Sequence, residues 1–141
     1  MDKVYYFLSN LYGAELHDFL LGVNGMNDTN LFNVMSVVLV IISMGVIPGF
    51  YYKLWDRATW SSSEKWLLML LVNAVVVFFV NVIWVYCLGD LMVDEEGKEL
   101  TIGLTNIVGF GFASAILATV LFFLASLGWK TKSTNCPSTP F

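Results

Sequence analysis

Three long stretches of the sequence carry no charged side chain, and the charged residues lie before, between and after them. The stretches cover residues 31–52, 66–89 and 100–129. An α-helix rises about 1.5 Å per residue, so about 20 residues are enough to cross the hydrocarbon core of a bilayer. The pattern therefore predicts an all-α integral membrane protein in which residues 31–129 form a bundle of three transmembrane helices.

The segment before the first stretch has apolar side chains at helical spacing and polar side chains opposite them. The apolar positions are Val4, Phe7, Leu8, Leu11, Tyr12, Leu16, Phe19, Leu20 and Val23. The polar side contains Ser9, Asn10, Gly13, His17 and Asp18. We expect residues 1–30 to form an amphipathic interfacial helix and a loop, with His17 solvated. The acidic polar side favours contact with protein over bare lipid. A fourth transmembrane span is the alternative.

A proline interrupts the first stretch. Because Pro48 has no N–H, the carbonyl of Met44 loses its usual helical partner. We therefore expect a kink or an early end of the first helix at Pro48-Gly49. The second helix is expected to start with a capping box from Ser61 to Glu64, in which each side chain bonds the backbone of the other residue.

The composition also favours a membrane protein over a soluble domain. Only 13% of the 141 residues are charged and 57% are apolar, with a mean hydropathy of +0.73. Soluble domains contain about 25% charged residues, so this chain cannot coat a soluble fold of its size. The net charge of −4 leaves no basic surface, which argues against nucleic acid as a partner.

The basic residues are distributed unequally between the connections. The first connection and the tail carry Lys53, Arg57, Lys65, Lys130 and Lys132. The positive-inside rule places both on the cytoplasmic side, so we expect the N-terminus outside and the C-terminus inside a plasma or bacterial inner membrane. Residues 130–141 form a polar tail whose composition predicts disorder.

Small residues follow one face of the third stretch at helical steps. That face carries Gly103, Ile107, Gly111, Ser114, Ala118, Phe122 and Ala125. Small side chains let another helix approach closely in a bilayer, where packing replaces the hydrophobic effect. Gly109 with Ala113 and Gly111 with Ala115 repeat the pattern. The face predicts a helix-packing seam, either with the chain's own helices or between copies of the chain.

Two amides share one face of the second stretch. The face carries Trp66, Leu70, Asn73, Val77, Asn81, Trp84 and Leu88. Unpaired amides are costly in hydrocarbon, so Asn73 and Asn81 should face protein or water. The first interpretation is hydrogen bonding between helices, with Ser36, Ser43 or Asn106 as partners. The second is a polar strip that lines a pore.

No recognisable catalytic pattern occurs in the sequence. The Gly-x-Ser-x-Gly, His-Glu-x-x-His, phosphate-loop and Cys-x-x-Cys patterns are all missing. We therefore expect no enzyme activity, catalytic residue, cofactor or metal. The sequence favours a small polytopic subunit of a membrane assembly, such as a secretion-type or effector complex. Its expected partners are the lipid bilayer and copies of itself or other membrane proteins. A channel or holin-like pore lined by Asn73 and Asn81 is the alternative.

Overall fold

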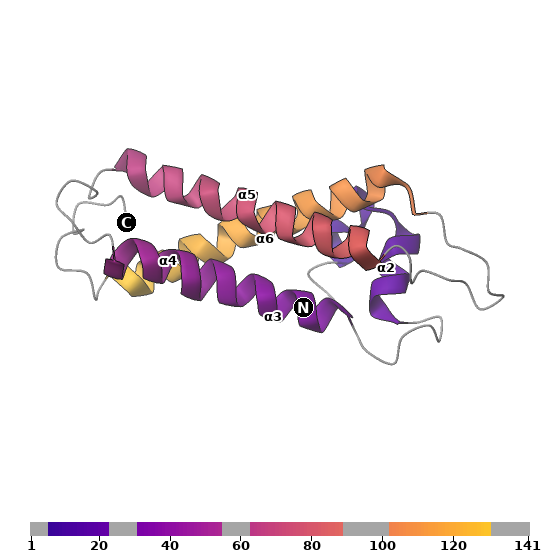
Figure 1. The fold of residues 1–141 in the computed structure, drawn as a ribbon, viewed down its shortest axis with the longest axis horizontal. Helices are drawn as coiled ribbons and strands as arrows, with labels where there is room; N and C mark the ends of the chain where they lie inside the picture. Colours follow the sequence, from indigo (N-terminus) through magenta and orange to yellow (C-terminus); the bar gives the residue numbers. More distant parts are fainter. Residues whose placement is uncertain (1–5, 23–30, 55–62, 89–101, 131–141) are drawn as a thin grey trace. The chain divides into compact units, whose positions relative to one another are not determined.

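The computed structural model describes residues 6–22, 31–54, 63–88 and 102–130, nearly all of which are helical and none of which forms a strand. Three helical segments are long and apolar enough to cross a membrane (Figure 1): Leu31–Tyr52, Ser63–Leu88 and Leu104–Trp129. The prediction of an all-α membrane protein with three spans is confirmed. The capping residue Ser61, residues 1–5 and the tail at 131–141 lie outside the described residues.

The N-terminal segment is a series of short helical pieces rather than one continuous amphipathic helix. Residues 6–8 are α-helical and are followed by a 3₁₀ turn, η1 (Ser9–Leu11), and then by α2 (Ala14–Leu21). Gly13 separates η1 from α2 with a φ of 84°, a conformation that glycine adopts at little cost. The eight residues of α2 extend only about 12 Å, so α2 is too short to be a fourth span.

The first span continues through Pro48, and the expected early end is wrong. It consists of α3 (Leu31–Val40), the π-helical η2 (Ile41–Val46), α4 (Ile47–Gly49) and the π-helical η3 (Phe50–Leu54). In η2 the N–H of Ile47 donates to the carbonyl of Ile42, five residues back. A π-helix widens the turn by one residue, and this wider geometry surrounds the proline on both sides. The helix therefore accommodates Pro48 without terminating.

The second and third spans are uninterrupted α-helices. The second, α5 (Ser63–Leu88), starts before the uncharged stretch and includes Glu64 and Lys65 in its first turn. The third, α6 (Leu104–Lys130), starts four residues later than the stretch predicted. Gly103 precedes it and accepts hydrogen bonds from the N–H groups of Asn106 and Ile107.

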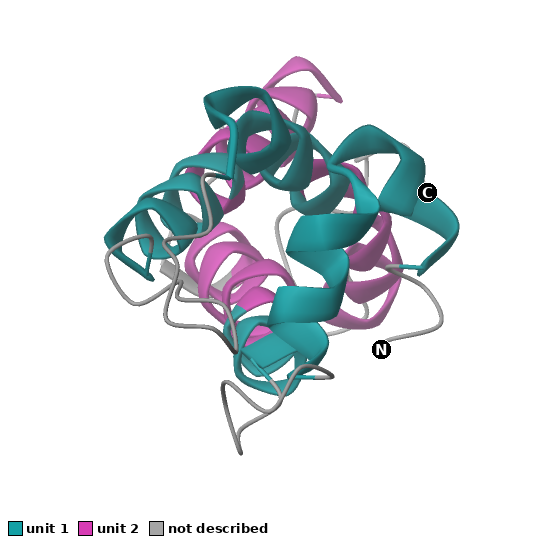
Figure 2. Ribbon diagram, turned by 90° about the vertical axis from the view of Figure 1, so that its right-hand side faces the viewer, with its two compact units in different colours: residues 1–38, 78–114 teal, residues 39–77, 115–141 magenta. Residues whose placement is uncertain are grey.

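The long helices contribute to two compact units (Figure 2). Unit 1 comprises residues 1–38 and 78–114, and unit 2 comprises residues 39–77 and 115–141. Within unit 2, one buried cluster contains Leu39, Val77 and Ala118. A second contains Tyr51, Tyr52, Trp66, Met69 and Phe122. These contacts pair an early residue of the first span with a late residue of α5, and the reverse, so the two helices run antiparallel within unit 2.

Candidate helix-packing and assembly site

The amide of Asn73 is buried inside unit 2 and is fixed by α6. Its side chain is fully buried, and Nδ2 donates a hydrogen bond of 3.0 Å to the backbone carbonyl of Ala118. Ser43 is fully buried in the same unit. Among the described atoms, Ser43 Oγ and Asn73 Oδ1 have no hydrogen-bond partner. The interhelical bond of Asn73 therefore goes to a backbone carbonyl rather than to one of the polar side chains considered from the sequence.

The other predicted polar residues belong to unit 1. Ser36 and Asn81 are buried, each with 4% of its surface exposed. Ser36 Oγ has no hydrogen-bond partner among the described atoms. Asn106 is only half-buried and lies beside the N-terminal segment, since a Cβ on Gly13 would lie 3.3 Å from Asn106 Nδ2.

Most of the small-residue face of α6 is buried. Gly103, which precedes the helix, is exposed, whereas the following members of the face are buried: Ile107, Gly111, Ser114, Ala118, Phe122 and Ala125. The face crosses both units, with Gly111 and Ser114 in unit 1 and the last three residues in unit 2. The face therefore contributes residues to the packing of each unit.

Two glycines of α6 receive two different segments of unit 1. The backbone of Leu11 and Tyr12 crosses directly over Gly109, where an added Cβ would collide with the carbonyl of Leu11. At Gly111 an added Cβ would lie 2.5 Å from Val82 Cγ2 and 2.9 Å from the ring of Phe78. The absence of a side chain at Gly109 thus allows the N-terminal segment to pack closely on α6, and the absence of one at Gly111 allows α5 to do so. Both positions are occupied by this chain itself.

His17 is buried, so the expectation of a solvated side chain is wrong. It is 5% exposed, and its Nδ1 is hydrogen-bonded to the Tyr12 hydroxyl at 2.8 Å. Its ring centroid lies 5.1 Å from that of Phe32, and the Tyr12 ring lies 5.3 Å from Phe110. The break at Gly13 sets α2 on a helical phase different from that of the preceding residues, which turns His17 inward. This aromatic cluster holds the N-terminal segment within unit 1.

The carbonyl released by Pro48 has a partner in α6. Trp129 Nε1 donates a hydrogen bond of 2.9 Å to the carbonyl of Met44, four residues before the proline. The Trp129 ring also lies close to Gly49, where an added Cβ would be 3.7 Å from it. Within unit 2, the indole N–H thereby supplies the hydrogen bond that the proline, which has no N–H, cannot donate to this carbonyl.

A groove of about 410 Å³ opens beside this hydrogen bond on unit 2. It is lined by Met44, Leu124, Ala125, Gly128 and Trp129. Gly128 is exposed, and a Cβ added to it would meet no described atom within 4 Å. The same is true of Gly45, next to Met44 in the sequence. Small residues therefore lie at the open surface here, unlike the glycines of unit 1 that the chain itself covers.

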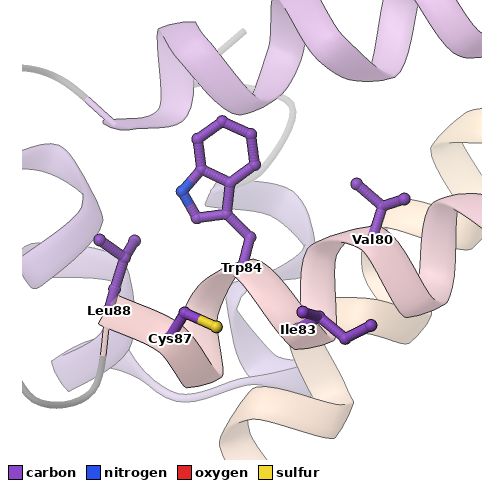
Figure 3. A pocket seen from close by; sticks show the side chains of 5 residues that line it. All are labelled: Val80, Ile83, Trp84, Cys87 and Leu88. Atoms are coloured by element: carbon purple, nitrogen blue, oxygen red, sulfur yellow. The ribbon is translucent and has the colours of Figure 1, made fainter.

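A second groove, of about 440 Å³, belongs to unit 1 and follows the last turns of α5 (Figure 3). Its lining side chains are Val80, Ile83, Trp84, Cys87 and Leu88. The Cys87 thiol is free and exposed. Apart from this thiol and the indole N–H of Trp84, the side chains that line the groove are apolar.

Comparisons with protein families, curated proteins and solved structures give no match. Among the described residues, no three His, Cys, Asp or Glu side chains lie close enough together to hold a metal ion.

Sequence reasoning did not find the bond between Trp129 and Met44 or the open groove next to it. Pro48 indicated that the Met44 carbonyl would lack a donor, but nothing in the local sequence connects it with a tryptophan 85 residues away. Gly128 continues α6 three residues after Ala125, which would have extended the small-residue face by one more step. The position of Gly128 on this face is the sequence feature that could have indicated the groove.

Proposed function

We propose that the chain is a non-enzymatic, multi-pass membrane subunit that associates with copies of itself. The groove beside Gly128 carries the proposal, because Gly128 lies exposed in it among apolar side chains, and Gly45, the sequence neighbour of the lining residue Met44, is exposed as well. Glycine weakens a helix by about 1 kcal/mol relative to alanine. In a bilayer, however, glycine allows another helix to approach closely, which can offset this cost. Gly109 and Gly111 of unit 1 are already covered by this chain, whereas the groove combines an open glycine with exposed apolar side chains and therefore suits a second copy.

The shape of the groove supports the same proposal. Ala125 and Gly128 are its small lining residues, and Met44, Leu124 and Trp129 are its large ones. Leu124 is 52% exposed and Met44 is 36% exposed, so both offer apolar surface to an incoming helix. An assembly of this kind is a scaffold or complex subunit. The basic residues favour an orientation with the N-terminus outside and the C-terminus cytoplasmic.

The pore alternative has weaker support. A pore lined by Asn73 and Asn81 needs both amides to face water, whereas both are buried and Asn73 donates to Ala118 within its own unit. We therefore expect liposomes that contain the protein to retain a small dye. Rapid dye release would favour the pore and contradict the scaffold.

The test is the number of copies in a bilayer, counted by single-molecule photobleaching after reconstitution at low protein density. We expect the natural chain to form oligomers and Gly128→Leu to be monomeric, because leucine fills the groove. Gly103→Leu is the matched control, since Gly103 is also exposed with no described atom within 4 Å of an added Cβ. A monomeric natural chain, or an unchanged copy number in Gly128→Leu, contradicts the proposal. Oligomers that form only with a different membrane protein would replace self-association by a heteromeric assembly.

A further inference from the structure

Two buried oxygen atoms of unit 2 lack hydrogen-bond partners among the described atoms, and they belong to facing helices. They are Ser43 Oγ, in the π-helical η2, and Asn73 Oδ1, in α5. Both residues are fully buried. An unpaired polar group inside a membrane protein is costly, so such atoms are normally satisfied by a hydrogen bond.

The register of the two helices places Ser43 and Asn73 at the same level. Leu39 and Val77 belong to one cluster, and the helices run antiparallel in unit 2. Ser43 follows Leu39 by four residues, and Asn73 precedes Val77 by four residues. Four residues are about one helical turn, or about 6 Å, in each helix. Because the helices are antiparallel, one turn along the first span from Leu39 and one turn back along α5 from Val77 lead in the same direction, to Ser43 and to Asn73.

The orientation of the Asn73 amide is fixed by α6. Its Nδ2 donates to the carbonyl of Ala118 at 3.0 Å. Since a carbonyl oxygen accepts only from the amide nitrogen, Oδ1 must point to the other side of the amide plane. Oδ1 is thus held in place as an acceptor, and the missing partner has to be a donor.

Apolar clusters bound this position on both sides. One turn in one direction lies the cluster of Leu39, Val77 and Ala118. One turn in the other direction lies Met69, within the cluster of Tyr51, Tyr52 and Trp66. A ligand at Ser43 and Asn73 is therefore small and isolated from bulk water. Neither span has an acidic or basic side chain between Leu31 and Tyr52 or between Trp66 and Leu88, so the site lacks the carboxylate ligands that hold divalent cations in proteins.

We propose that Ser43 and Asn73 bind one buried water molecule that bridges the π-helical segment of the first span to α5. Water supplies two donors and two acceptors, so it donates to Asn73 Oδ1 and either donates to or accepts from Ser43 Oγ. The π-helical geometry coincides with the site, in keeping with the frequent occurrence of such segments at functional positions. The water forms a polar joint between helices, separate from the assembly groove.

The proposal is tested by magnetisation transfer from water to the Asn73 side-chain amide, measured by solid-state NMR on the full chain in bilayers. We expect this signal to build up at least twofold faster than those of the backbone amides of Leu39 and Val77, which lie in the apolar cluster. Ser43→Ala should slow the transfer to Asn73 at least twofold, and Ser43→Thr, which retains the hydroxyl, should preserve it.

Ser126→Ala is the matched control, because the buried Ser126 hydroxyl already donates to the carbonyl of Phe123 at 2.7 Å. It should leave the transfer to Asn73 unchanged. Transfer to Asn73 no faster than to Leu39 and Val77 would overturn the proposal. So would transfer that is insensitive to Ser43→Ala, which would mean that Ser43 is not part of the site. Equally fast transfer to all three residues would show a continuous water file instead of one isolated molecule.

Discussion

Gly109→Ala is expected to release the N-terminal segment from α6 with the addition of a single methyl group. The added Cβ would collide with the backbone carbonyl of Leu11 and would lie 3.2 Å from the Cα of Tyr12. Backbone atoms cannot turn away as a flexible side chain can, so the segment has to move as a whole. We expect a loss of about 2 to 3 kcal/mol in the free energy of unfolding, at the upper end of the usual cost of overpacking.

The measurement is hydrogen exchange of residues 6–22 together with unfolding in a denaturing detergent. In Gly109→Ala the amides of α2 should lose their protection before those of α5 and α6 do. Gly128→Ala is the matched control on the same helix, because its added Cβ meets no described atom within 4 Å. That variant should be as stable as the natural chain or more so. Equal protection of α2 in the two variants would mean that Leu11 and Tyr12 do not pack on Gly109.

Gly111→Leu should destabilise the chain by about 3 kcal/mol or more, because its first added carbon already overlaps α5. That carbon would lie 2.5 Å from Val82 Cγ2 and 2.9 Å from Phe78 Cδ2. These obstacles are side chains, so the smaller change Gly111→Ala should be partly rescued by Val82→Ala, which removes one of them. The free energy of unfolding, measured for both single variants and for the double variant, checks the expected coupling.

The same variant distinguishes the two interpretations of the small-residue face. If Gly111 contacts α5 of its own chain, Gly111→Leu lowers stability, and the molecules that remain folded keep the natural copy number. If Gly111 lies between copies, the stability of the monomer is unchanged and the copy number falls. The second result would contradict the packing described here for unit 1.

The three spans were predictable because charges are excluded from hydrocarbon, and the uncharged stretches alone define them. The inward position of His17 was not predictable. The prediction assumed one continuous helix through Gly13, but the positive φ of Gly13 breaks the helix there. The depth of Asn73 was predictable from its cost in lipid, but its partner was not. That partner is the backbone carbonyl of Ala118, and every residue has such a group, so it leaves no mark in the sequence.

The glycines illustrate the same limit for the assembly site. Spacing identified Gly111 and Gly109 as small residues on α6, but it did not distinguish a position covered by α5 from one covered by the N-terminal segment. Spacing also did not distinguish Gly109 and Gly111 from Gly128, where an added Cβ would meet no described atom within 4 Å. The number of atoms around each glycine depends on segments distant in sequence, and only the three-dimensional arrangement within each unit supplies it.

Cysteine cross-linking along α6 tests the central claim, association of copies through the groove beside Gly128, most directly. Single cysteines are placed at Leu124, Ile116 or Phe112, which are each at least 50% exposed, in a chain whose Cys87 and Cys136 are replaced by serine. After oxidation in bilayers, the account predicts a covalent dimer for Leu124→Cys and little or none for Ile116→Cys and Phe112→Cys. No dimer at Leu124, or equal dimer at all three positions, would contradict it.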